Sequence, residues 1–143
     1  MTIARVLAGK PIAEIFSASA DMTVQEVVAL LAERRIGALP VVEGDRLVGI
    51  ISERDVIYCA AREGAAALAR PVREVMTPRP LTTTPEVSVL EALALITQRR
   101  VRHLPVLDGD RLIGLISIGD LVKFRIDAIE AEAEAMRAYI QTA

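Results

Sequence analysis

The sequence contains two copies of one segment, and this duplication constrains the fold more than any other feature. When the chain is shifted by 65 residues, positions 24–55 align with positions 89–120 without a gap, and 17 of the 32 aligned pairs are identical. Internal similarity of this kind is typical of proteins built from repeated structural units. We therefore expect two similar halves that pack against each other.

Each copy starts with a helical pattern. Apolar side chains recur three and four residues apart, which places one apolar stripe on a helix of about twelve residues. Each of these helices is expected to cover a sheet. The matching positions are Val24, Val27, Val28 and Leu31 in the first copy, and Val89, Ala92, Leu93 and Ile96 in the second.

Two apolar runs separated by a Gly-Asp turn follow each predicted helix, with the turns at residues 44–45 and 109–110. Runs joined in this way predict a β-hairpin, and their nearly continuous hydrophobicity indicates that both faces of the strands are covered. A second helix is expected after Ser52 and after Ser117.

Short extended pieces near residues 16–19 and 81–84 complete a β-α-β-β-α order in each copy, so the expected fold class is α+β. The segment between the copies contains three prolines but keeps apolar residues, which favours a folded connector over a flexible linker. The expected divisions are a first repeat with the N-terminal segment at 1–61, the connector at 62–80, a second repeat at 81–125 and a C-terminal helix at 126–143.

The composition excludes several classes of function. At 143 residues the chain suffices for one compact unit that buries roughly two thirds of its unfolded surface. Its net charge of -2 provides no broad attraction to nucleic acid or anionic lipid. No apolar stretch approaches the ~18 residues that cross a bilayer, so we expect no membrane span.

The N-terminus and the cysteine content indicate a cytoplasmic protein. Arg5 and Lys10 interrupt the apolar residues at the N-terminus, so no secretion signal is expected. The single cysteine, Cys59, forms no intramolecular disulfide and provides no cluster for zinc, which fits a reducing compartment.

The ends of the two hairpins resemble a known family signature. Gly-Ile-Ile-Ser-Glu-Arg-Asp at 49–55 and Gly-Leu-Ile-Ser-Ile-Gly-Asp at 114–120, each after Leu-Pro-Val and a Gly-Asp turn, resemble the cystathionine-β-synthase (CBS) domain motif. Met76-Thr77-Pro78 resembles the usual connector, and the resemblance covers about residues 11–125. It implies a stand-alone tandem pair, called a Bateman module, whose two sheets pack about a pseudo-twofold axis and form two clefts.

The resemblance also implies a ligand and roles for four residues. Clefts of this family bind adenosine derivatives such as AMP, ADP, ATP, NAD or S-adenosylmethionine, with the motif aspartate on the ribose hydroxyls and the motif serine near phosphate. These roles fall on Asp55 with Ser52 and on Asp120 with Ser117. An adenine nucleotide is thus expected as a regulatory ligand and not as a catalytic cofactor.

The same residues have a structural interpretation. A helix start with unpaired N–H groups attracts phosphate, and a carboxylate can accept two hydrogen bonds from a diol. However, Ser52 with Asp55, and Ser117 with Asp120, also fit capping boxes in which the acid bonds back to the cap. A glycine at 49 and at 114 either lets a ligand approach or permits tight packing. The residues alone leave both alternatives open.

The two copies differ in charge near the expected clefts. Arg102 and His103 of the second copy replace two small residues of the first, and Arg54 has no basic counterpart in the second. Since basic residues before Leu-Pro-Val contact phosphates in the family, the resemblance implies a stronger cleft and a weaker one. The stronger cleft is expected to combine Ser52, Arg54 and Asp55 with Arg102 and His103, while the Asp120 cleft is expected to take a less charged ligand or none.

Neither a metal site nor a catalytic set stands out. His103 is the only histidine, and a single histidine supplies too few ligands for a metal site. For this residue, a surface or turn position without a role is the alternative to ligand binding. No Ser/His/Asp or Cys/His arrangement has a suitable context. We expect a non-enzyme.

The C-terminal segment predicts a long helix with a heptad-like stripe. The stripe either forms a seam between two chains or folds back over the apolar surface of its own module, and the resemblance implies a homodimer in either case. The stripe residues are Val122, Ile126, Ile129, Ala133, Met136 and Ile140.

The expected function is that of a sensor that binds an adenosine-containing ligand and signals to a separate effector protein. Such signalling requires the ligand to prefer one arrangement of the repeats. The alternatives are a structural dimerisation module with vestigial clefts and an enzyme of unknown type.

Overall fold

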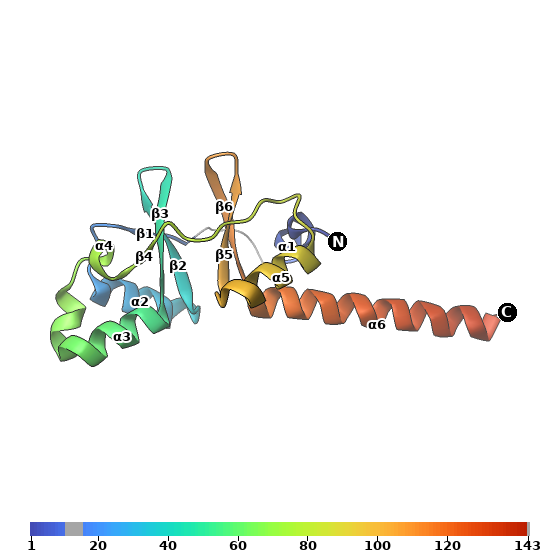
Figure 1. Ribbon diagram of the computed structural model, residues 1–143. Coiled ribbons are helices and arrows are strands. Elements are labelled where there is room, and N and C mark those ends of the chain that lie inside the picture. The colour runs from blue at the N-terminus through green and yellow to red at the C-terminus, as the bar shows by residue number, and fades with distance from the viewer. Residues whose placement is uncertain (11–15, 143) are drawn as a thin grey trace.

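Two halves of similar architecture lie side by side in the computed structural model (Figure 1). The structure describes residues 1–10 and 16–142, so the expected start of the CBS-like region at residue 11 lies outside the described residues. Each half has a hairpin that points in the same direction and helices below and beside it. The expected α+β class and the repeated arrangement are confirmed.

The first half is built on a four-stranded sheet with strand order β1-β2-β3-β4. Helix α2 covers this sheet and starts with a capping box in which the side chain of Thr23 accepts from the backbone of Glu26. The elements are β1 (Ala18–Ser19), α2 (Val24–Arg34), β2 (Ala38–Glu43), β3 (Arg46–Ser52), α3 (Glu53–Glu63) and β4 (Thr77–Pro78).

The second half repeats this order with a smaller sheet. Its elements are α5 (Val89–Arg99), β5 (His103–Asp108), β6 (Arg111–Ser117) and α6 (Ile118–Thr142). The strand expected near 81–84 is reduced to one parallel bridge, in which Thr83 pairs with Val106. Pro80 and Pro85 stand on either side, and because proline lacks an N–H group, it limits further pairing.

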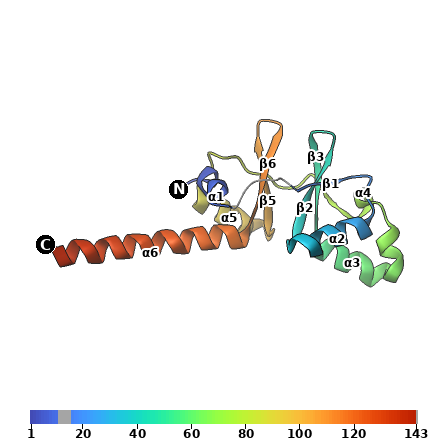
Figure 2. The same cartoon turned by 180° about the vertical axis from the view of Figure 1, so that it is seen from behind.

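The first helix of the chain packs on the second half. Ile3 and Val6 of α1 (Ile3–Ala8) belong to the core of the second half, whereas Val72 of α4 (Val72–Val75) belongs to the core of the first. Figure 2 also shows α1 beside α5 and α4 beside α2. The N-terminal helix therefore packs with the second half, although the expected division at 1–61 groups it with the first repeat because of its place in the chain.

The segment between the repeats is folded. It contains the 3-10 helix η1 (Gly64–Ala69), the short helix α4 and the edge strand β4. Ala67 is buried, and the N–H of Val72 donates to the carbonyl oxygen of Met22 at 2.8 Å. Strand β4 of this segment pairs with β3 and is the outer strand of the first sheet.

Helix α6 leaves the body of the molecule and carries the C-terminus away from it (Figure 1). Leu121 is buried in the second core, but the stripe residues from Ile126 onward are exposed. The alternative in which this helix folds back over its own module is therefore wrong. None of the described helices combines the length and the apolar character that a bilayer crossing requires.

Candidate functional site

A cavity of about 480 Å³ lies between the two repeats. It is lined by residues of α3 and β4 from the first repeat and by residues around the start of β5 and the end of β6 from the second. Asp120 does not line it. Of the predicted site residues, the structure brings together Ser52, Arg54, Asp55, Arg102, His103 and Ser117.

Asp55 uses one carboxylate oxygen for the helix and turns the other toward β4. Its Oδ2 accepts from the backbone N–H of Ser52 at 2.9 Å and from the Ser52 hydroxyl at 3.1 Å. The N–H of Asp55 donates to that hydroxyl in return. Its Oδ1 accepts from the hydroxyl of Thr77 at 3.2 Å, a contact that a small ligand hydroxyl can replace.

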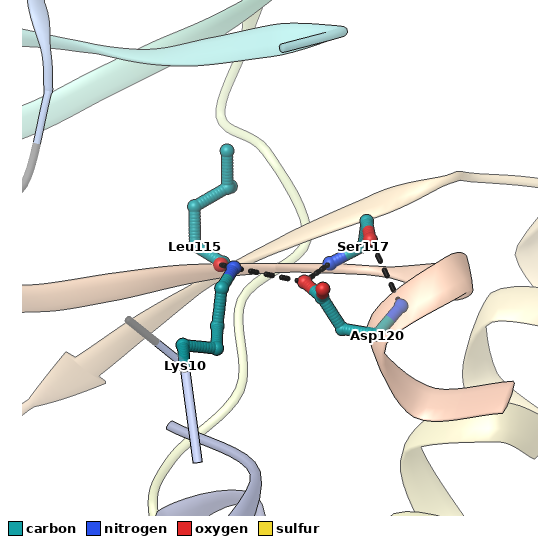
Figure 3. Close-up of polar contacts among 4 residues, drawn as sticks. All are labelled: Lys10, Leu115, Ser117 and Asp120. Atoms are coloured by element: carbon teal, nitrogen blue, oxygen red, sulfur yellow. Dashed lines mark hydrogen bonds and ion pairs between the residues drawn. The ribbon is translucent and has the colours of Figure 1, made fainter. Parts of the chain in front are cut away.

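Asp120 makes the same cap but has a charged partner (Figure 3). Its Oδ2 accepts from the N–H of Ser117 at 2.9 Å and from the ammonium group of Lys10 at 2.8 Å. Burial acts to raise the pKa of Asp120, but the hydrogen bonds from Lys10 and Ser117 outweigh it and hold the pKa below its ordinary value. The Asp120 carboxylate is therefore compensated within the chain.

The capping interpretation of both Ser-x-x-Asp pairs is confirmed by these bonds. Each serine hydroxyl accepts from the N–H of the aspartate three residues on, at 3.4 Å in α3 and 3.0 Å in α6. Capping satisfies backbone groups at the helix start and stabilises the helix by about 1 kcal/mol. Because a carboxylate has two oxygens, it does not exclude a second contact.

His103 lies at the junction of the two repeats. Its Nε2 is 3.5 Å from the position that a Cβ atom at Gly37 would occupy. Burial lowers the pKa of His103 and outweighs the raising effect of the Asp120 charge. The neutral imidazole therefore contributes a donor and an acceptor to the cavity, and a phosphate beside it would favour its protonated form.

The cavity wall combines cationic and apolar side chains. Arg54, Arg100 and Arg102 line it together with the acids Glu53 and Asp55. Such a lining suits a ligand that has an anionic part and an apolar ring. The apolar and aromatic lining residues are Ile50, Tyr58, Pro80, Leu81, Val101 and Ile118.

Two strand glycines permit close packing. A Cβ atom at Gly49 would lie 2.5 Å from Sδ of Met76 and 2.9 Å from the carbonyl oxygen of Thr77, and one at Gly114 would lie 2.7 Å from the side chain of Leu7. These distances favour the packing interpretation over ligand approach.

Sequence reasoning missed Lys10, Thr77, Tyr58 and Arg100. A weak signal for Lys10 existed, because an offset of 69 residues aligns 2–10 with 71–79 and places Lys10 opposite Arg79, although Val6 and Val75 are the one identical pair. Both segments have apolar residues at two equivalent positions, and in both the basic residue is followed by proline. The apolar residues are Ile3 and Val6 in the first segment and Val72 and Val75 in the second. The similarity is too short to detect without the packing of α1 and α4.

The sequence matches the CBS domain family over residues 9–62 and again over residues 72–127. The chain belongs to the CBS domain family. This CBS pair is 37% identical over 126 residues to the CBS domain-containing protein CBSX3, mitochondrial, of Arabidopsis thaliana, with 85% of this chain and 61% of the relative covered. The pair therefore spans less than two thirds of that relative.

Solved structures of CBS proteins share the fold of this pair. A protein with CBS domains from Burkholderia ambifaria superposes with a TM-score of 0.84 at 43% identity, over 89% of this chain and 95% of the other. The structure of CBSX2 in complex with AMP gives a TM-score of 0.77 at 24% identity, over 88% and 97% of the two chains. At the latter identity the likeness concerns the fold alone.

Proposed function

We propose that this CBS pair is a non-catalytic regulatory module that binds an adenosine-containing ligand between its repeats and signals to a separate effector protein. AMP, ADP or ATP fit the proposal best, and NAD or S-adenosylmethionine are further members of the same class. The single observation that supports it is the cavity that Asp55 shares with Arg102 and His103.

The roles in the cavity follow from the chemistry of its wall. Oδ1 of Asp55 and the hydroxyl of Thr77 would hold a ribose diol, because a carboxylate oxygen can accept a further donor and the Thr77 hydroxyl can turn away from Asp55 to suit the ligand. Arg54 and Arg102 would hold phosphate, with Ser52 at the start of α3. Tyr58 offers an aromatic surface for a base.

The ligand class has support from the family. CBSX2 holds AMP on the same fold. A cavity with three arginines also favours a ligand that carries phosphate over a neutral nucleoside. Both considerations favour AMP as the first ligand to test.

Signalling would follow from the position of the ligand between the repeats. A ligand that contacts Asp55 of the first repeat and Arg102 of the second binds most tightly when the repeats lie at one distance. Such differential affinity shifts the population of arrangements toward the bound one. An effector that prefers one arrangement would then respond to the ligand.

We place the module in a reducing compartment such as the cytoplasm, since Cys59 is a free thiol.

Thermal unfolding in the presence of each candidate ligand tests this function. A ligand at about 100 times its Kd stabilises the native state by about 2.7 kcal/mol if it binds only that state. We expect AMP to raise the Tm of the wild type, Arg102→Ala to reduce the shift, and Arg99→Ala, which removes an arginine that does not line the cavity, to leave it unchanged. No shift with any of the five ligands would contradict the proposal.

Helix α6 favours a second role, the pairing of two copies of this chain. Five apolar side chains of its stripe are between 42% and 67% exposed. The flanking charges change from Lys123 and Arg125 to three glutamates at 130, 132 and 134, so the basic part of one helix can face the acidic part of another. The five side chains are Val122, Ile126, Ile129, Met136 and Ile140.

The mass of the protein in solution tests this pairing. We expect light scattering after size exclusion to give a dimer for the wild type and a monomer for Ile129→Glu, because a buried charge in the stripe opposes association. Ala131→Glu adds the same charge two positions away and off the stripe, and it should leave the dimer intact. A monomeric wild type, or a dimeric Ile129→Glu, would contradict pairing through α6.

A further inference from the structure

Lys10 reaches from the N-terminal segment into the second repeat and binds two acceptors there (Figure 3). Its ammonium nitrogen lies 2.9 Å from the backbone oxygen of Leu115 and 2.8 Å from Oδ2 of Asp120. The Lys10 side chain is 38% exposed and the Asp120 side chain 28%. The contact joins residues 110 positions apart in the chain.

The residues equivalent to Leu115 and Asp120 line the cavity in the first repeat. The 65-residue offset relates Leu115 to Ile50 and Asp120 to Asp55. Ile50 and Asp55 both face the open cavity. In the second repeat, Lys10 therefore contacts the two residues whose counterparts line the cavity in the first.

The counterpart of Lys10 leaves the first cleft open. The offset of 69 residues relates Lys10 to Arg79, which is exposed and forms no ion pair with any residue in the described part of the chain. In its place, the neutral hydroxyl of Thr77 contacts Asp55. The charge of Asp55 thus has no cationic partner within hydrogen-bond distance among the described side chains.

An ammonium group and a vicinal diol compete for these acceptors. Lysine offers three N–H donors and no acceptor, and a diol offers two O–H donors. The bond from an ammonium group to a carboxylate is the stronger kind, because both partners are charged. A ribose could enter the second cleft only after the Lys10 side chain had moved away.

We propose that Lys10 is an internal occupant of the second cleft, closes it to adenosine-containing ligands, and leaves one open site in each chain. This inference rests on the proposed function of the first cleft. It identifies Lys10 as a second reason, beside the difference in arginines, why the two clefts are unequal.

Counting the binding sites for adenosine tests the closure. Adenosine is the appropriate probe because the sequence counterparts of Arg54 and Arg102 are the glycines Gly119 and Gly37, so a phosphate gains little in the second cleft. Calorimetric titration of the full chain should give one site in the wild type and two sites in Lys10→Met. Lys10→Arg keeps a cation and should keep one site. Arg79→Met removes the counterpart cation and should also keep one site.

The pKa of Asp120, followed by NMR without ligand, separates the contact from ligand binding. Lys10→Met should raise this pKa, because the cation that lowers it is gone. An unchanged pKa would overturn the contact, and two sites in the wild type or one in Lys10→Met would overturn the closure. If neither adenosine nor AMP binds any of the proteins, the proposed function fails, while the pKa still reports on Lys10.

Discussion

The two clefts of this CBS pair share a motif but differ in what meets its aspartate. Asp55 contacts the neutral Thr77 hydroxyl beside an open cavity, whereas Asp120 contacts the Lys10 ammonium group. Both partners come from segments that precede the duplicated core and follow related paths. The comparison teaches that a motif repeated within one chain acquires different contacts from the segment that packs beside it.

The largest effect is expected on AMP affinity. Asp55→Ala should weaken AMP binding about 10- to 100-fold, because a hydrogen bond to a charged group contributes about 1.5–3 kcal/mol. Asp120→Ala removes an acid that does not line the cavity and should change the affinity less than about twofold. Calorimetric titration measures both.

Asp55→Asn provides the control for folding, since asparagine also caps helices but lacks the charge. It should melt close to the wild type and still bind AMP more weakly. Equal losses for Asp55→Ala and Asp120→Ala would show that the clefts are equivalent and would overturn the comparison.

The two strand glycines should differ in their effect on stability. Gly49→Ala meets the backbone oxygen of Thr77 and should lower the free energy of unfolding by about 1–2 kcal/mol. Gly114→Ala meets only the end of the flexible Leu7 side chain and should cost less than about 1 kcal/mol. Urea unfolding of both variants checks the order, which would be reversed if β4 could shift more easily than Leu7.

Removing Lys10 should have a smaller effect that depends on pH. Lys10→Met should lower the free energy of unfolding by less than about 1 kcal/mol at neutral pH, since the pair is partly exposed and screened. The pKa of Asp120 is lower in the folded chain than its ordinary value of 3.8, so its stabilisation is present above that pH and is lost as the pH falls through the lower, folded value. Urea unfolding measures this at two pH values. The variant and the wild type should differ in free energy of unfolding at neutral pH and should agree in acid.

The smallest effect is expected at His103. Its pKa in the folded chain is below the ordinary value of 6.5, so the unfolded chain binds a proton first and the wild type loses stability as the pH falls through 6.5. His103→Gln should lose less stability over that interval. A variant with the same pH dependence as the wild type would show that His103 is not held neutral between the repeats.

Most of the fold could be predicted from local sequence patterns. The stripe of Val24, Val27 and Leu31 is buried as expected, and the hairpins turn at the Gly-Asp positions. These features depend on residues close together in the chain, which is why periodicity reveals them. The extended piece near Thr83 could not be predicted in detail, because a single bridge between two prolines produces no alternation of apolar and polar residues.

The sequence predicted most of the residues that line the cavity, but it did not predict all of them. Six of the seven predicted residues line one cavity, and their roles there stay a prediction. Asp120 lies outside this cavity and bonds to Lys10. The capping bonds of both aspartates were one of two open alternatives. Thr77 and Lys10 could not be assigned to a cleft without the paths of α4 and α1.

The amino-acid sequence alone determined that this protein is a duplicated CBS pair with one cation-rich half-site, because the repeat, the strand patterns and the motif are all local. Only the tertiary structure decided that Asp55 lines a cavity, that Asp120 bonds to Lys10 and that α6 projects from the body. The physical reason is that the contacts of the two aspartates join side chains 22 and 110 positions apart. Such contacts follow from how segments pack in space, which short-range periodicity does not encode.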